Sequence, residues 1–339
     1  RKQGTTELML RAVVDADVEL YYDGSEKLAT TSTGIDVTGT VTADGLTVAG
    51  NVSIDGGTIK LDGNYPVGTD NVALGNAALD SITSGAGNIA IGDSAATALT
   101  TGSNAIAIGR DAMSGAVFTG SDAVAVGRST LAALTSGSNN VAVGALALNA
   151  STTASNNTAV GFEALKTGIT AIESTAVGSK ALLNTTGSYN TAFGYRAGED
   201  ITTGTQNVAI GRNVMANSAG VTGNENVGVG GAALYDLTSG SFNTAIGQEA
   251  LRFNTTASNN TAVGYQAGYS NETGIQNVAI GSQALKDSTT GNFNVAVGYF
   301  ALEANTTGVN NTAFGNYALD ANTTGVSNAA YGYGSLSAT

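Results

Sequence analysis

Several residue types that ordinarily carry chemistry are missing from this chain. Its 339 residues include no Cys, no His and no Trp, and the only proline is Pro66. Without His the chain lacks the commonest general base and a principal metal ligand, and without Cys it has neither a disulfide framework nor a thiolate nucleophile. The sequence therefore argues against an enzyme and predicts no catalytic residue, no metal site and no cofactor.

Charge is also scarce. Charged residues make up 12% of the chain, and the net charge is −13 with no basic cluster, so we expect no nucleic-acid partner. No apolar run approaches the roughly eighteen residues of a membrane-spanning helix, so we expect no membrane insertion. The chain begins at Arg1 without Met or a signal peptide, and we interpret it as a fragment or a processed segment.

Small residues dominate what remains. The chain has 47 Gly, and its hydrophobic content of 42% is supplied mostly by Ala and Val. Disordered chains combine low hydrophobicity with high charge, which is not the pattern here. Because Ala and Val are too small to fill a thick core, the composition favours a thin and repetitive β structure.

A short phrase, "NNTAVGYQAG" at 259–268, recurs in variants along most of the chain. The glycine after its bulky apolar residue, here called the rung glycine, occurs sixteen times, and twelve of the fifteen intervals are 17 residues, the others being 16, 18 and 19. A fixed short period predicts a solenoid in which each repeat forms one turn, or rung. We therefore expect an all-β fold, a parallel β-roll or β-helix solenoid of about sixteen 17-residue rungs. The rung glycines are Gly75, Gly92, Gly109, Gly127, Gly144, Gly161, Gly178, Gly194, Gly211, Gly230, Gly247, Gly264, Gly281, Gly298, Gly315 and Gly332.

The three residues before each rung glycine indicate a strand. The middle one, the rung alanine, is Ala in fifteen of sixteen rungs, as at Ala262, and Gly228 is the exception. Its two neighbours, the flanking residues, are larger: the first is usually Val, Ile or Thr and the second is always bulky and apolar, as at Thr261 and Val263. Such alternation places the flanking residues on one face and the alanine on the other. We expect the flanking residues to fill the interior and the rung alanine to face outward.

An outward position that never accepts a large or polar side chain predicts a second surface pressed against it. Because the restriction recurs at every rung, the contact must run parallel to the solenoid axis. The simplest such surface is another copy of the same chain. We therefore predict that the solenoid packs as a parallel homotrimer.

The residues after the rung glycine predict a tight turn. The first two, the ridge residues, vary freely, so we expect them to be exposed, with the rung glycine adopting a positive φ. The fourth, the turn leucine, is usually Leu, as at Leu165 and Leu251, and follows an Ala in most rungs. We expect these residues to form a second short strand whose leucine packs inward against the bulky flanking residue.

An asparagine lies four residues before the rung glycine in thirteen of sixteen rungs, as at Asn260. Stacked one rung apart, these ladder asparagines would hydrogen-bond to their neighbours and satisfy backbone groups of the turns. We favour this structural role over a catalytic or glycan-binding one.

The first 66 residues lack the 17-residue period. "VELYYDGSEKLATT" (18–31) predicts a hairpin with its turn at 23–24, and residues 34–63 alternate in short segments separated by Gly and Asp-Gly turns. We expect a slimmer N-terminal β shaft at 1–66, joined through "YPVG" (65–68) to a β-roll at 67–339.

These patterns carry a resemblance to known families. The repeated phrase resembles the head repeats of YadA-type trimeric autotransporter adhesins, which are left-handed parallel β-rolls of three chains packed side by side. Residues 19–48 are similar to shaft segments of bacteriophage tail fibres, in which YadA-type repeats also occur. The rungs here are longer than in typical adhesin heads, and this segment shows neither a coiled-coil stalk nor a membrane anchor, which favours the phage fibre.

The resemblance implies a structural and adhesive fibre of a phage virion. It implies a trimeric rod, extracellular on the virion, whose partners are other virion tail proteins and a host cell-surface receptor, either glycan or protein. Four ridge residues, Tyr195, Tyr265, Tyr299 and Tyr333, are candidates for receptor contact; the alternative is that they belong to a solvated turn that tolerates any residue.

Two other functions remain open from the sequence. One is the head domain of a bacterial trimeric adhesin on the cell surface. The other is a spacer in a polysaccharide-degrading tailspike, although glycoside hydrolysis needs paired carboxylates and the acidic residues here, such as Glu163, Glu249 and Glu303, are scattered without a recurrent partner.

Overall fold

The computed structural model describes residues 9–12, 18–22, 25–31, 34–38, 69–115, 117–217 and 219–337. By their contacts the residues divide into two compact units, Arg1–Lys60 and Leu61–Thr339. The domain boundary predicted after residue 66 and most of the predicted shaft, from residue 39 onward, lie outside the described residues.

The first unit contains a four-stranded antiparallel sheet in the order β1-β2-β3-β4. Its strands are β1 (Leu10–Ala12), β2 (Val18–Tyr22), β3 (Ser25–Thr31) and β4 (Gly34–Val37). Tyr22 pairs with Ser25 across the two-residue connection, which confirms the predicted hairpin. Glu19 of β2 is buried and accepts hydrogen bonds from Arg11 and from the Tyr21 hydroxyl, at 3.1 and 2.7 Å.

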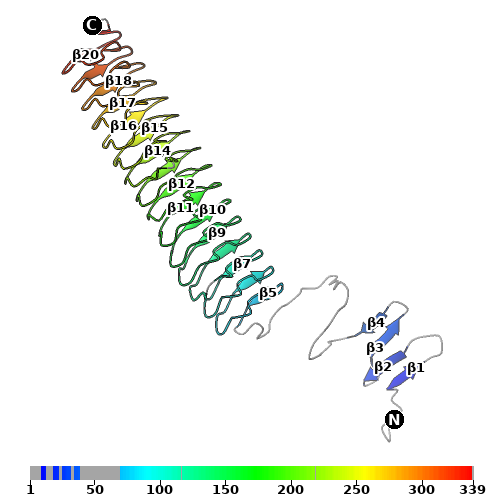
Figure 1. The fold of residues 1–339 in the computed structure, drawn as a ribbon. Coiled ribbons are helices and arrows are strands. Elements are labelled where there is room, and N and C mark those ends of the chain that lie inside the picture. Colours follow the sequence, from blue (N-terminus) through cyan, green and yellow to red (C-terminus); the bar gives the residue numbers. More distant parts are fainter. Residues whose placement is uncertain are drawn as a thin grey trace. The chain divides into compact units, whose positions relative to one another are not determined.

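The second unit is a parallel β-solenoid, as predicted, with one three-residue strand per rung, and Figure 1 shows the strands stacked in chain order. Each strand pairs with the next in uniform register, so that Ala262 lies beside Ala279 and the flanking residues lie beside their own counterparts. The constant period therefore produces columns of equivalent residues along the axis. The strands are β5 (Val72–Leu74), β6 (Ile89–Ile91), β7 (Ile106–Ile108), β8 (Val124–Val126), β9 (Val141–Val143), β10 (Thr158–Val160), β11 (Thr175–Val177), β12 (Thr191–Phe193), β13 (Val208–Ile210), β14 (Val227–Val229), β15 (Thr244–Ile246), β16 (Thr261–Val263), β17 (Val278–Ile280), β18 (Val295–Val297), β19 (Thr312–Phe314) and β20 (Ala329–Tyr331).

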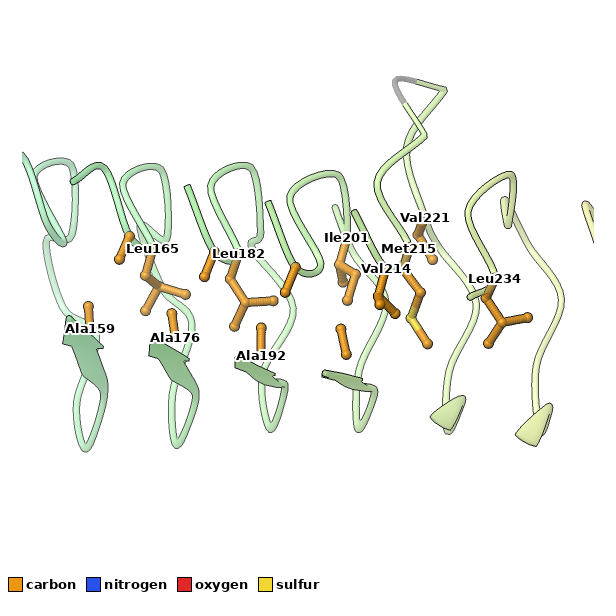
Figure 2. Packing of buried hydrophobic residues seen from close by; sticks show 14 of the residues in the cluster. Ala159, Leu165, Ala176, Leu182, Ala192, Ile201, Val214, Met215, Val221 and Leu234 are labelled. Carbon is orange, nitrogen blue, oxygen red and sulfur yellow. The ribbon is translucent and has the colours of Figure 1, made fainter. Parts of the chain in front are cut away.

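The rung alanines point into the solenoid, so the predicted orientation of the strands was wrong. Ala159, Ala176 and Ala192 are fully buried, and Figure 2 shows them directed from their strands toward Leu165 and Leu182 on the opposite wall. The flanking residues lie on the outer face, where all are half-buried or exposed. The six threonines among them, which the sequence placed inside, also face outward. Alanine is small here because the interior is narrow.

The wall opposite the strands is made of turns, not of the second strand that was expected. The turn leucines are buried, as predicted, except Leu336 on the last rung, but they pack against rung alanines instead of the bulky flanking residue. The backbone adopts a positive φ at the second ridge residue and again at the turn leucine, +56° at Glu163 and +50° at Leu165. This conformation breaks the alternation of a strand, so that the turn leucine and the alanine before it both face the core.

One rung shows how closely the two walls fit. Val214 takes the place of the alanine before the turn residue Met215, and the next rung has Gly228 in place of its rung alanine. A Cβ atom on Gly228 would lie 2.6 Å from Val214 Cγ1, well inside van der Waals contact. The larger valine on one wall therefore requires the glycine on the other, because tightly packed interiors do not tolerate extra atoms.

The predicted asparagine ladder is confirmed. Asn260 is buried, its amide nitrogen donates to Asn243 Oδ1 at 3.2 Å and to the carbonyl of Gly274 at 2.9 Å, and its own Oδ1 accepts from the backbone nitrogen of Asn277 at 2.9 Å. The amide of Asn260 thus binds the rungs on both sides and a turn carbonyl. Ala105, Ala123 and Ser174 interrupt the column.

The rung glycines form a second column, and the conformation and close packing at these positions require glycine. Gly264 has a φ of +136°, a conformation that side chains disfavour. A Cβ atom on it would lie 2.5 Å from the carbonyl oxygen of Gly281, its counterpart on the next rung. The absence of a side chain therefore lets successive turns approach at strand spacing.

A further interior column lies at the seventh residue after most rung glycines and was not predicted. We call it the second interior column. Up to Leu134 its buried members are apolar. The middle rungs mix polar Ser151 and Thr185 with apolar residues, and from Asn254 onward every buried member is polar. The apolar members are Ile82, Leu99, Phe118 (displaced by an 18-residue rung), Leu134, Ile201, Val221 and Leu237, and the polar members of the C-terminal rungs are Asn254, Asn271, Ser288, Asn305 and Asn322.

Candidate receptor-contacting surface

The ridge residues follow each solenoid strand directly and form an exposed turn, as predicted. Tyr195, Tyr265, Tyr299 and Tyr333 follow β12, β16, β18 and β20, and their exposed fractions are 51%, 46%, 41% and 80%. Their position is fixed by the rung glycine, which turns the chain away from the sheet. All four candidate residues are therefore accessible to a large partner.

Two of the four tyrosines belong to one aromatic cluster. The rings of Tyr299 and Tyr333 both contact Tyr317, with centroids 5.5 and 5.8 Å apart, and Phe300 stacks on Tyr317 at 5.6 Å. We refer to Tyr299, Phe300, Tyr317 and Tyr333 as the aromatic cluster. Tyr195 and Tyr265 lie on separate rungs and make no ring contact within the described part of the chain.

Tyr317 and Phe300 were not among the residues predicted from the sequence. Both are second ridge residues, while the four predicted tyrosines are first ridge residues. Aromatic ridge residues occur on three successive rungs, and this was the signal available in the sequence. Because the rungs stack in register, rings one rung apart are expected to meet. Recognising that signal required the ridge to be treated as two adjacent columns.

The environment of Tyr317 disfavours ionisation of its phenol. Desolvation raises the pKa of Tyr317 above its ordinary value, and the neighbouring Tyr299 and Tyr333 add to the shift. The cluster therefore presents aromatic rings with hydroxyl groups at their edges. Such a surface suits contacts that combine an apolar ring face with hydrogen bonds at its edge.

The ridge changes character just before the cluster. On three earlier rungs the second ridge residues are joined by side-chain hydrogen bonds, from Gln266 to Glu249 at 2.8 Å and from Gln283 to Gln266 at 3.1 Å. The aromatic cluster continues the same column with rings. The C-terminal ridge thus offers a hydrogen-bonding segment followed by an apolar one.

Other classes of site were sought in the same structure. Among the described residues, no three acidic side chains lie close enough together to hold a metal ion. The described residues also contain no helix with the length and hydrophobicity needed to cross a bilayer. Comparison with known proteins gave no match to a protein-family model, a curated protein or a solved structure.

Proposed function

We propose that this chain is a structural and adhesive fibre of a phage virion, a trimeric rod that carries or forms the surface for the host receptor. The observation that supports the proposal most directly is the outer face of the sixteen-stranded sheet. Two flanking residues on each of sixteen strands give 32 positions, and none of them holds a charged residue. Ridge residues, by contrast, include Arg110, Lys180 and Arg212.

The outer face is an extended apolar surface. Phe193, Phe314 and Tyr331 are exposed by 43%, 51% and 70%, and the remaining flanking residues are at least partly accessible. Soluble proteins rarely leave a contiguous apolar patch of more than a few hundred Å² open to water, and larger patches mark interaction surfaces. The contact predicted at the rung alanines loses its basis because those alanines point inward, and it is the uncharged outer face at the flanking residues that supports association instead.

A second copy of the chain is the partner that fits this face. Its columns repeat at the strand spacing of about 4.8 Å over sixteen rungs, so a partner must carry the same period to remain in contact. A parallel copy has that period by construction. Closed rotational symmetry buries the same face on every subunit. The resemblance to trimeric adhesin heads favours three copies.

Light scattering after size-exclusion chromatography tests the association. The chain should elute as a trimer, and replacing Ile246 and Ile280 together by Lys should dissociate it because two charges would be buried in each interface. Ser282→Lys is the matched control, since Ser282 is a ridge residue beside the same strands and the trimer should persist. A stable wild-type monomer at micromolar concentration would contradict the proposal.

Adhesion is tested separately with host cells. In this proposal the aromatic cluster contributes to receptor contact, so the variant Tyr299→Ala, Tyr317→Ala, Tyr333→Ala should compete poorly with labelled virions while remaining trimeric. Substituting Tyr195 and Tyr265 distinguishes a contact along the whole ridge from one limited to the cluster. Unchanged competition by both variants would favour the alternative that the ridge is a solvated turn with no role in receptor contact.

A further inference from the structure

We propose that a cleft in the turn ridge binds an anionic sugar, a saccharide unit that carries a carboxylate or a phosphate. The inference deepens the proposed function, on which it rests for the role of the ridge as a receptor surface. The cleft has a volume of about 410 Å³ and lies across three rungs, between Arg212 on one side and Gln248 and Arg252 on the other. A monosaccharide fits within the usual size of ligand sites.

The cleft exists because one rung has small ridge residues. Gly231 and Ala232 occupy the two ridge positions that hold Arg212 and Asn213 on the preceding rung and Gln248 and Glu249 on the following rung. A Cβ atom on Gly231 would meet no atom within 4 Å, and its φ lies outside the left-handed range. Neither the backbone nor the packing requires glycine at this position, so the open space is the only consequence of its small size.

The charge of the cleft differs from that of the chain. Two arginines and one glutamate line it, while the protein as a whole carries a net charge of −13. Arg252 is already engaged: its Nη1 donates to Glu249 Oε1 at 2.8 Å, and its guanidinium lies 5.5 Å from the ring centroid of Tyr235. Arg212 forms no ion pair within the described part of the chain. It is therefore the cation available to a ligand.

Polar groups around Arg212 suit a hydroxylated ligand. Asn213 and Arg252 line the cleft, and neither Asn213 Oδ1 nor Arg252 Nε has a hydrogen-bond partner in the protein. Both atoms are covered, so rotation of these side chains is needed to present them to a ligand. Buried polar groups of this kind cost free energy unless something binds them. The amide of Gln248 and the ring of Tyr235 add a further hydrogen-bonding group and an aromatic wall. Arg212 would form charge-assisted hydrogen bonds with the anionic group of the sugar.

Binding of soluble sugars to the intact chain tests the inference, by saturation-transfer NMR and calorimetry. Glucuronate and glucose 1-phosphate are the probes, and glucose is the neutral control. The two anionic probes distinguish a carboxylate from a phosphate. We expect Arg212-dependent binding of at least one of them, and about tenfold weaker binding in Arg212→Ala.

Two variants separate the cleft from general surface charge. Gly231→Tyr fills the cleft with a residue that other rungs carry at the same ridge position, and it should abolish binding. Arg128→Glu changes the charge of a first ridge residue on a distant rung and should leave binding unchanged, whereas Arg212→Glu should abolish it. Ser179→Tyr, the same substitution on a rung without the cleft, is the control for Gly231→Tyr.

The outcomes also distinguish this inference from the proposed function. If neither anionic probe binds, or if glucose binds equally well, the inference is overturned. The proposed function would then still stand on the trimeric state and on competition with virions, both of which are measured without these sugars. If the chain is monomeric but binds glucuronate through Arg212, the cleft is supported and the fibre is not.

Discussion

The N-terminal and C-terminal rungs of the solenoid use the same backbone but fill it in different ways. Near the N-terminus the second interior column is apolar, and the asparagine ladder is interrupted at Ala105 and Ala123. In the C-terminal rungs the column turns polar from Asn254 onward, and the ladder is continuous from Asn190. One part of the rod therefore depends mainly on apolar contact, and the other depends more on amide hydrogen bonds.

This difference indicates that only a few positions specify the 17-residue rung. The rung glycine, the rung alanine and the inward turn residues recur in both parts, and they set the strand and the turn. The second interior position, by contrast, holds Phe, Leu, Asn or Ser as buried residues on different rungs. Four substitutions test this difference between the two parts through their effect on the free energy of unfolding, and they follow in order of expected effect.

Phe118→Ala should be the most damaging change and would remove the largest side chain of the apolar column. Phe118 is 1% exposed, and truncating a buried Phe costs about 3–5 kcal/mol in free energy of unfolding. Chemical denaturation measures the loss. Val117→Ala, at an adjacent residue that is 62% exposed, is the control and should change stability by less than about 0.5 kcal/mol.

Asn260→Ala should be the destabilising substitution in the C-terminal rungs that corresponds to Phe118→Ala in the N-terminal rungs. It removes hydrogen bonds to two rungs and leaves the Gly274 carbonyl and the Asn277 backbone nitrogen without this partner. We expect a loss of about 2–4 kcal/mol. Hydrogen exchange should show local opening of the adjacent strands. Asn76→Ala, which deletes an exposed side-chain hydrogen bond, should have little effect.

Gly228→Ala tests the fit between the two walls at the middle of the rod. The added methyl group would collide with Val214, and overpacking of this kind costs about 1–3 kcal/mol. Adding Val214→Ala restores the pair found on most rungs, so the double variant should recover most of the loss. Equal stability of single and double variants would show that the two positions do not interact.

Asn254→Leu should have the smallest effect and the opposite sign. Asn254 is fully buried, and neither atom of its amide has a hydrogen-bond partner in the protein. Leu237 occupies the same position on the preceding rung, so leucine extends the apolar column by one residue. We expect a gain of about 1–2 kcal/mol by denaturation. A loss instead would indicate that internal water satisfies this amide.

Much of the solenoid could be predicted from the sequence because its period is explicit. The rung spacing, the strand before each rung glycine, the exposed ridge and the asparagine ladder all follow from residues that recur at fixed intervals. Alternation along a strand also shows which residues share a face. It does not show which face points inward, since a uniform alanine indicates a close neighbour on either side.

The orientation could have been inferred from one irregular rung. Val214 and Gly228 change size in opposite directions, which is expected only if both lie in the same interior. The turn opposite the strands was harder to predict, because leucine disfavours the positive φ that Leu165 adopts there. The cleft at Gly231 also escaped prediction, because it is created by what neighbouring rungs carry and not by a motif of its own.

The stacked rung glycines make the solenoid a molecular ruler. Since each glycine touches the next through backbone atoms alone and backbone hydrogen bonds join neighbouring rungs, the rise per repeat is set by main-chain packing and does not change with the side chains. Deleting or duplicating one 17-residue unit should shorten or lengthen the molecule by a single increment of about 4.8 Å while preserving both of its ends. Length can thus evolve independently of whatever the surface recognises.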